Sequence, residues 1–144
     1  MRIIALDVGT KRIGVAMSDP LGIIAQGAKT VLAADEQKAL EEILAFAAAN
    51  EAAEIVVGLP LNMDGTESQM TRFARDFAGK LKEKAPQITI VMRDERLTSL
   101  QIERDLIFLD VSREKRKKIN DMLAAQIILQ NYLDSRRREE EKNV

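Results

Sequence analysis

Residues 2–18 read Arg-Ile-Ile-Ala-Leu-Asp-Val-Gly-Thr-Lys-Arg-Ile-Gly-Val-Ala-Met-Ser, two largely apolar segments separated by a short polar one. The first segment, Arg2–Asp7, is an almost wholly apolar run that ends abruptly in an acid, which is typical of a strand buried on both faces. Residues 8–11 are turn-like, and Arg12–Ser18 is strand-like again. Because so short a turn joins the two strands, we expect them to pair as an antiparallel hairpin.

The rest of the chain alternates between strand and helix patterns. The expected elements are strands at 23–31, 54–59 and 88–92, a helix capped by Asp35, a helix opened by Thr66, and two helices at 98–108 and 112–133. Three antiparallel strands therefore come first, and strand-helix-strand crossovers make the remaining pairings parallel. Ligands of such sheets bind beyond the carboxyl ends of the parallel strands, which is where Asp7 and Glu95 fall.

The composition excludes several kinds of site. The chain has 144 residues, 46% of them hydrophobic, which suits one domain with a core of its own. It has no Cys and no His, so thiolate metal sites, a cysteine nucleophile and a Ser-His-Asp triad are excluded. Catalysis would rest on carboxylates, hydroxyls, Lys and a hard cation with oxygen ligands. With no secretory signal and no apolar run of the roughly 18 residues that a membrane helix needs, we expect a cytoplasmic protein that binds no membrane.

Two strand ends carry candidate acids. A carboxylate that ends a buried strand, as Asp7 does, is costly unless it is solvated, paired or bound to a cation. The structural alternative is an Asp that caps the following turn. Asp94 and Glu95 end the fifth strand and point to opposite faces, so we expect one of them to reach the site. The alternative there is a salt-bridge network with Arg93 and Arg96.

Asp121 lies inside the last predicted helix. At about 100° per residue it shares a face with Ala125 and Ile128, whereas Gln126 and Gln130 lie roughly opposite. We therefore expect the helix to direct Asp121 toward the sheet. The alternative is an acid favoured by the dipole of the first helical turn. That alternative fails if the helix begins near residue 112, because Asp121 then lies more than two turns inside.

Three converging carboxylates suit a hard divalent cation. Asp7, Glu95 and Asp121 would favour Mg²⁺ or Mn²⁺. Two such ions, about 3.5–4 Å apart, can activate a water and stabilise the leaving oxygen in phosphodiester hydrolysis. Asp64, in the loop after Pro60, is a reserve candidate, although Asp-Gly there is also an ordinary turn.

A basic cluster precedes Asp121 in the sequence. Its members are Arg113, Lys115, Arg116, Lys117 and Lys118. If the last helix presents Asp121 to the cations, this cluster lies one to two turns away and can contact the phosphates that flank the scissile bond. The alternative is a solvated helix end.

Four motifs, taken together in this order, closely resemble the YqgF family, also called RuvX, over residues 1 to about 133. The motifs are Leu6-Asp7-Val8-Gly9-Thr10-Lys11-Arg12-Ile13-Gly14-Val15-Ala16, then Val57-Gly58-Leu59-Pro60 with Asn62 and Gly65-Thr66, then Asp94-Glu95-Arg96-Leu97-Thr98, and last Asp121 with Leu123-Ala124-Ala125 and Ile128-Leu129-Gln130-Asn131-Tyr132-Leu133. The resemblance implies a ribonuclease-H-like α/β fold in three layers. It implies a mixed five-stranded sheet of order 3-2-1-4-5, with the first three strands antiparallel and helices on both faces.

Matched residue by residue, the acids of the family fall on Asp7, Glu95 and Asp121, which would also be the metal ligands. One departure from the wider RuvC pattern concerns the second acid. There it closes the strand beside the first, but here that strand ends in Gly58-Leu59-Pro60, so Glu95 sits one strand further out, roughly 10 Å from the first strand. A glutamate leaning inward would close that gap, and Asp64 stays in reserve.

The resemblance implies a metal-dependent endonuclease using two Mg²⁺ or Mn²⁺ ions. Members are described as nucleases for the 5′ end of the 16S ribosomal RNA precursor, or as Holliday-junction resolvases, so pre-rRNA in ribosomal particles and branched DNA are both expected partners. The protein would be a monomer or a homodimer. The predicted substrate-binding residues are Lys11, Arg12 and Arg96, with Arg113, Lys115, Lys117 and Lys118 of the basic cluster. The nuclease domain is expected at 1–135, with a charged, flexible tail at 136–144.

Two other functions compete with cleavage. Leu6-Asp7-Val8-Gly9-Thr10 also resembles the phosphate-binding hairpin of actin-like ATPases and sugar kinases. Those proteins clamp nucleotide between two such domains, whereas 144 residues supply one. The second rival is a non-catalytic module that binds RNA or the ribosome through the basic cluster.

Overall fold

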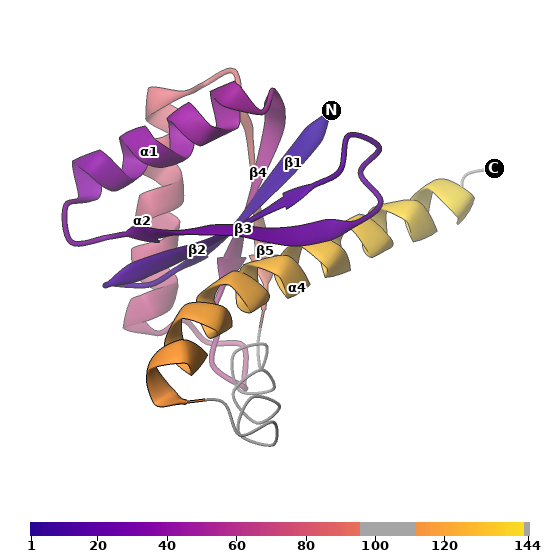
Figure 1. Cartoon of the computed structure of the whole chain (residues 1–144). Helices are drawn as coiled ribbons and strands as arrows, with labels where there is room; N and C mark the ends of the chain where they lie inside the picture. Colours follow the sequence, from indigo (N-terminus) through magenta and orange to yellow (C-terminus); the bar gives the residue numbers. More distant parts are fainter. Residues whose placement is uncertain (96–111, 143–144) are drawn as a thin grey trace.

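Five strands form one mixed sheet in the order β3-β2-β1-β4-β5 (Figure 1). The computed structural model describes residues 1–95 and 112–142, with the backbone alone for residues 113, 114 and 116–120. The strands are β1 (Arg2–Val8), β2 (Arg12–Ser18), β3 (Ala25–Leu32), β4 (Ala52–Leu59) and β5 (Thr89–Asp94). β1 pairs with β2, and β2 with β3, in antiparallel fashion, whereas β1–β4 and β4–β5 are parallel. The predicted strand order and directions are therefore confirmed.

Helices cover both faces of the sheet, which gives the expected three layers (Figure 1). α1 (Glu36–Ala49) and α2 (Gln69–Lys84) share one core with apolar side chains of β1, β2 and β4. α4 (Arg113–Lys142) packs on the opposite face, over a second and smaller core. The helix predicted at 98–108 lies outside the described residues. α4 continues as a helix to Lys142, and the division of the chain at residue 135 stays a prediction.

The starts of α1 and α2 follow from side-chain caps. Asp35 caps α1 as predicted, since its carboxylate accepts the backbone N–H of Lys38. α2 begins after Ser68, so the prediction that Thr66 opens it was wrong by three residues. The reason is that Thr66 belongs to the preceding turn, where its N–H and its hydroxyl both donate to Oδ1 of Asp64, at 3.0 and 2.6 Å.

α4 contacts the sheet over a wider face than the helical spacing predicted. Ala125 and Ile128 are buried against the sheet, as expected. Gln126 and Gln130 do not lie on the opposite side, however, because their Oε1 atoms accept the backbone N–H groups of Gly27 and Ala25, each at 2.9 Å. That prediction was wrong because α4 also packs beside the edge strand β3, which a pattern centred on Asp121 and Ile128 does not reveal.

Glycines beneath α4 let the helix approach the sheet. A Cβ atom on Gly14 of β2 would lie 1.9 Å from the backbone oxygen of Asp121. On Gly58 of β4, it would lie 2.6 Å from Cδ1 of Ile128. Real Cβ contacts are never this short, so any larger residue at either position would displace α4 or its side chains. The position of Asp121 over the sheet depends on this contact.

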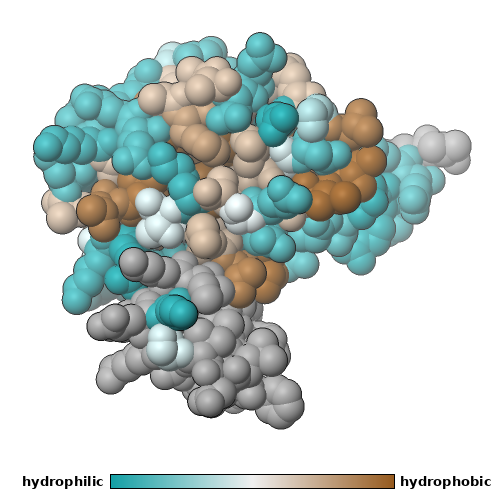
Figure 2. Space-filling view, viewed as in Figure 1, coloured by the Kyte–Doolittle hydropathy of each residue, from teal (hydrophilic) through white to brown (hydrophobic). Residues whose placement is uncertain are grey.

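Exposed apolar side chains gather at the loop between β2 and β3. Leu21, Ile23 and Ile24 lie there, to the right in Figure 2. In the described part of the chain, no helix has the length and apolar character needed to span a membrane.

The contact at Gly14 gives a matched pair of stability predictions. Gly14→Ala should lower the free energy of unfolding by roughly 1–3 kcal/mol, or more where α4 cannot shift, because the new methyl group overlaps the backbone of α4. Gly79→Ala is the control: nothing lies within 4 Å of a Cβ there, inside α2, so it should stabilise by up to about 1 kcal/mol. Urea denaturation of both variants measures the difference. Equal stability of the two would contradict the close approach of α4 to β2.

Candidate active site

Two of the three predicted acids meet where β1 ends. Asp7 is the last residue but one of β1, and it lies opposite Gly14 in the register of β1 with β2. Because Gly14 has no side chain, the backbone of α4 at Asp121 packs directly against it. The Asp121 carboxylate is then close enough to Asp7 to repel it electrostatically. The β1–β2 hairpin and α4 thus bring together the carboxylates of Asp7 and Asp121, which are 114 positions apart in the sequence (121 − 7).

The surroundings of Asp7 favour its neutral form. Burial, and after it the repulsion from Asp121, raise the pKa of Asp7 from 3.8 to about 6. Within residues 1–95 and 112–142, no group donates a hydrogen bond to this carboxylate and no cation pairs with it. A partly buried carboxylate without a donor is costly, so this side chain is not explained as a structural cap of the β1–β2 turn.

Asp121 differs because it has a cationic partner. Nε of Arg12 lies 2.6 Å from Oδ2 of Asp121, and the two side chains are 31% and 20% exposed. Arg12 is the first residue of β2 and precedes Gly14 by two positions, so both lie on the α4 side of the sheet. Sequence reasoning had assigned Arg12 to substrate, and nothing in the sequence signalled this pairing. Lys11, its neighbour, is exposed.

The side chain of Glu95 extends from the end of β5 toward β1, as expected for an acid that has to reach Asp7 across the intervening strand β4. Its Cγ atom lies 3.5 Å from the position that a Cβ of Gly58 would occupy, and its side chain is only 8% exposed. The side chain therefore passes over β4, the strand between β5 and β1. Asp94 is exposed by comparison. The backbone N–H of Glu95 donates to the carbonyl of Leu59 at 3.0 Å, which fixes the end of β5 beside the end of β4.

Arg93 connects Glu95 to α4. Its Nε lies 3.7 Å from Oε1 of Glu95, and its Nη2 donates to the hydroxyl of Ser135 at 2.7 Å. The guanidinium also lies over the ring of Tyr132, 5.8 Å from the centroid. The salt bridge within the strand end was one of the two readings of the sequence. The anchoring by Ser135 and Tyr132 was missed, because no local pattern relates β5 to a helix 40 residues later.

The donor set fits a hard divalent cation, although the acids are not gathered around one point. In the described ranges, no group of three or more acidic side chains is placed to hold a metal ion. In the part of the chain that the structure describes, Arg12 and Arg93 pair with the two outer acids, while Asp7 between them has neither a donor nor a counter-charge. A carboxylate left in this way is a ligand that a cation with oxygen preference would satisfy.

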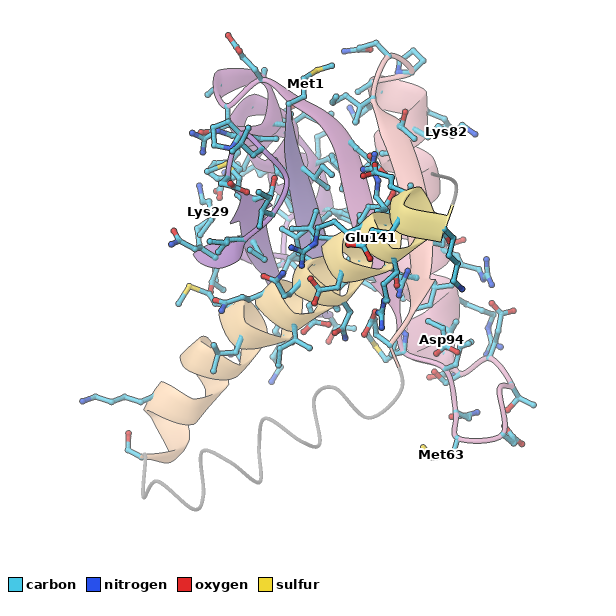
Figure 3. All side chains as sticks on the ribbon, turned by 90° about the vertical axis from the view of Figure 1, so that its right-hand side faces the viewer. Met1, Lys29, Met63, Lys82, Asp94 and Glu141 are labelled. Carbon is cyan, nitrogen blue, oxygen red and sulfur yellow. The ribbon has the colours of Figure 1, made fainter. Side chains whose placement is uncertain are left out.

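The reserve acid lies in the loop after β4, and several predicted substrate contacts are exposed or lie outside the described residues. Asp64 accepts from Thr66 within the loop that follows β4. Figure 3 shows neighbouring Met63 at the same end of the sheet as Asp94, with Met1 at the opposite end. Lys115 is exposed. Arg96 lies outside the described residues, as do the side chains of Arg113, Arg116, Lys117 and Lys118.

A hollow of about 550 Å³ lies away from the acids. It is lined by Met1, Arg2, Leu21 and Arg136, among others, and therefore sits near the start of β1 rather than its end. It contains none of the candidate acids. Asp7 and Glu95 are instead at the carboxyl ends of the parallel strands β1 and β5, and Asp121 approaches Asp7 from α4.

The chain matches known proteins along almost its whole length. The model of the family described as "RuvX: Holliday junction resolvase" matches residues 1–135. A protein of Halalkalibacterium halodurans named "Putative pre-16S rRNA nuclease" is 48% identical over 136 residues, which cover 93% of this chain and 96% of that protein.

Two solved structures share the fold at low sequence identity. The fowlpox virus Holliday junction resolvase is 12% identical, with a TM-score of 0.57, and the match covers 94% of this chain and 99% of that one. RuvC of Thermus thermophilus, in complex with a Holliday junction, is 13% identical with a TM-score of 0.54, covering 94% and 95%. These likenesses confirm the predicted ribonuclease-H-like, RuvC-like fold. With the family model covering residues 1–135 and a relative at 48% identity, this chain belongs to the RuvX (YqgF) family.

Proposed function

We propose that this protein is an endonuclease that hydrolyses phosphodiester bonds of nucleic acid in the cytoplasm, with Asp7, Asp121 and Glu95 as its metal ligands. The observation that carries the proposal is Asp7 itself. It is a partly buried carboxylate at the catalytic edge of the sheet, raised in pKa to about 6 and repelled by Asp121. A bound cation would offset the unfavourable free energy of the ionised Asp7 carboxylate.

The residues have separate tasks in this proposal. Asp7 would lie at the centre of the site, with Asp121 from α4 on one side and Glu95 from β5 on the other. When bound, Mg²⁺ or Mn²⁺, as one ion or a pair, would supply a water nucleophile and charge stabilisation at the leaving oxygen. No histidine is present to act as a base, so a carboxylate of the site would accept the proton that the water loses.

The substrate we favour is the precursor of 16S ribosomal RNA. The relative at 48% identity is named for that substrate, whereas the structures with Holliday-junction titles are only 12–13% identical. One cut needs one active site, so a monomer acting on ribosomal particles suffices. The second candidate is a four-way DNA junction, which the description of the family model favours. Cutting two symmetric strands would require a homodimer.

The two substrates and the role of Asp7 are tested in one cleavage assay. Purified protein with Mg²⁺ or Mn²⁺ should cut precursor 16S RNA in preference to a four-way junction. Asp7→Asn should lower the cleavage rate at least a hundredfold, because it removes the central charged ligand. Gel analysis of end-labelled substrates measures both. Cleavage of the junction alone would transfer the proposal to the second candidate, and a wild-type rate for folded Asp7→Asn would refute the assignment of the acids.

The same substitution should change stability in a pH-dependent way. In metal-free buffer, the folded protein binds a proton on Asp7 more tightly than the unfolded chain does, so ionisation of Asp7 costs stability as pH rises from about 4 to about 6. The cost should level off above that range at about 3 kcal/mol or less. Asp7→Asn, which cannot ionise, should therefore be more stable than wild type at pH 7.5 and nearly equal at pH 4. Denaturation of both proteins in EDTA at pH 4 and pH 7.5 measures this difference in the free energy of unfolding. A difference that became larger toward pH 4 would contradict the raised pKa.

The end of β5 gives a further test. Glu95→Gln should reduce cleavage far more than Asp94→Asn, because Glu95 leans over Gly58 toward Asp7 whereas Asp94 is exposed. We expect a loss of at least tenfold against less than threefold, on the scale of removing one metal ligand compared with a surface charge. Single-turnover rates at saturating Mn²⁺ separate the two. Equal losses would indicate that the strand end acts only as an ion-pair network.

The basic cluster before Asp121 is proposed to hold phosphates of the substrate. Replacing Lys115, Lys117 and Lys118 together by Ala should weaken RNA binding and reduce the slope of log affinity against log salt by about two, if most of them contact phosphate. Binding titrations at several salt concentrations, made with Asp7→Asn as the background, measure the slope. An unchanged slope would show that the cluster is a solvated helix end.

A further inference from the structure

Arg12 and Asp121 form the tightest contact between the β1–β2 hairpin and the acidic site. The 2.6 Å separation of Nε and Oδ2 is that of a charge-assisted hydrogen bond. The Asp121 carboxylate therefore has one oxygen committed to a guanidinium, on the helix face that also approaches Asp7. A cation that binds between the two acids must share Asp121 with Arg12 or separate them.

The other outer acid has an arginine as well, but in a different arrangement. Arg93 is anchored away from Glu95 by Ser135 and by the ring of Tyr132, and it lies at 3.7 Å, beyond a normal hydrogen bond. In the described part of the chain, Arg12 pairs with Asp121 and with no other side chain. Of the two arginines, Arg12 is thus the one that makes a direct hydrogen bond to a proposed metal ligand.

We propose that Arg12 is a built-in counter-ion of the acidic site, which holds Asp121 through its guanidinium and competes with a divalent cation for that carboxylate. This inference rests on the proposed metal site. It gives Arg12 a role before substrate arrives: the pair offsets part of the repulsion between Asp121 and Asp7, and the cation then has to replace an existing contact. Arg12 is in this sense a positioning residue, acting through Asp121.

Competition and simple structural support predict opposite changes in metal affinity. If Arg12 competes, Arg12→Gln removes both a positive charge and an occupant of Asp121, and the protein should bind Mn²⁺ more tightly. We expect about a tenfold lower dissociation constant, the order produced by one unit charge a few ångströms from a divalent ion in a water-like dielectric. If Arg12 only keeps Asp121 in place, its loss should weaken binding.

The experiment is a titration with Mn²⁺, followed by electron paramagnetic resonance at pH 7.5, on full-length protein without nucleic acid. Lys11→Gln is the matched control, because it removes the same charge from the adjacent, exposed position. It should change the Mn²⁺ affinity less than twofold. Arg12→Lys keeps the charge and should stay within about threefold of wild type. Thermal melts with and without Mn²⁺ should show a larger stabilisation of Arg12→Gln than of wild type.

Each outcome has one meaning. Unchanged or weaker Mn²⁺ binding by folded Arg12→Gln overturns the inference, as does an equal effect of Lys11→Gln, which would show a diffuse charge effect. If Arg12→Gln does not fold, Arg12→Met carries the same titration, in which tighter Mn²⁺ binding supports competition and unchanged or weaker binding refutes it. The proposed function fails in a different way: wild-type protein would bind no Mn²⁺, or Asp7→Asn would bind it as tightly as wild type.

Discussion

The close approach of α4 to β2 at Gly14 is the constraint on which the site depends. A helix packed at ordinary distance on a sheet keeps about 10 Å between backbone layers, and a short Asp side chain could not then reach a carboxylate on the strand next door. Gly14 removes the side chain that would hold the helix away, and the backbone of Asp121 takes its space. Gly58 leaves room for the end of the Ile128 side chain, and the Glu95 side chain passes it at ordinary contact distance. Packing and chemistry are therefore specified by the same glycines.

This packing brings carboxylates close together, and positive charges do not compensate all of them equally. The two outer acids each face an arginine, from the start of β2 and the end of β5. Asp7, between them, faces none in the described residues, so the unfavourable energy is concentrated on one side chain. Local sequence rules fail at such places, since an acid closes a buried strand where an apolar residue or a paired charge would be more stable. The core beneath it, formed by β1, β4 and two helices, is conventional and apolar.

The strands could be predicted because each is an apolar run with clear ends, and short turns made the first three pair in antiparallel fashion. The order of all five strands came from the resemblance to the family. The sequence also singled out Asp7 and Asp121 as candidates, since an acid at a strand end and an acid on a buried helix face both break the local pattern, and the structure brings these two together. Arg12 was found as a cation but not as a partner of Asp121, because the pairing depends on the distance between layers, which spacing does not encode. Gln126 and Gln130 were misplaced for a related reason: the sheet twists around α4 and brings β3 to a helix face that looked solvent-exposed.

The two glutamines have a consequence for how molecules of this protein meet one another. β3 is an edge strand, and an open edge presents peptide groups on which a strand of another chain can assemble. Here the amide side chains of α4 already take up the N–H groups of Ala25 and Gly27, and Gln130 also donates to the carbonyl of Ile23. The start of this edge is therefore closed by the protein's own helix. Another strand that added to the sheet at this point would have to break those hydrogen bonds first.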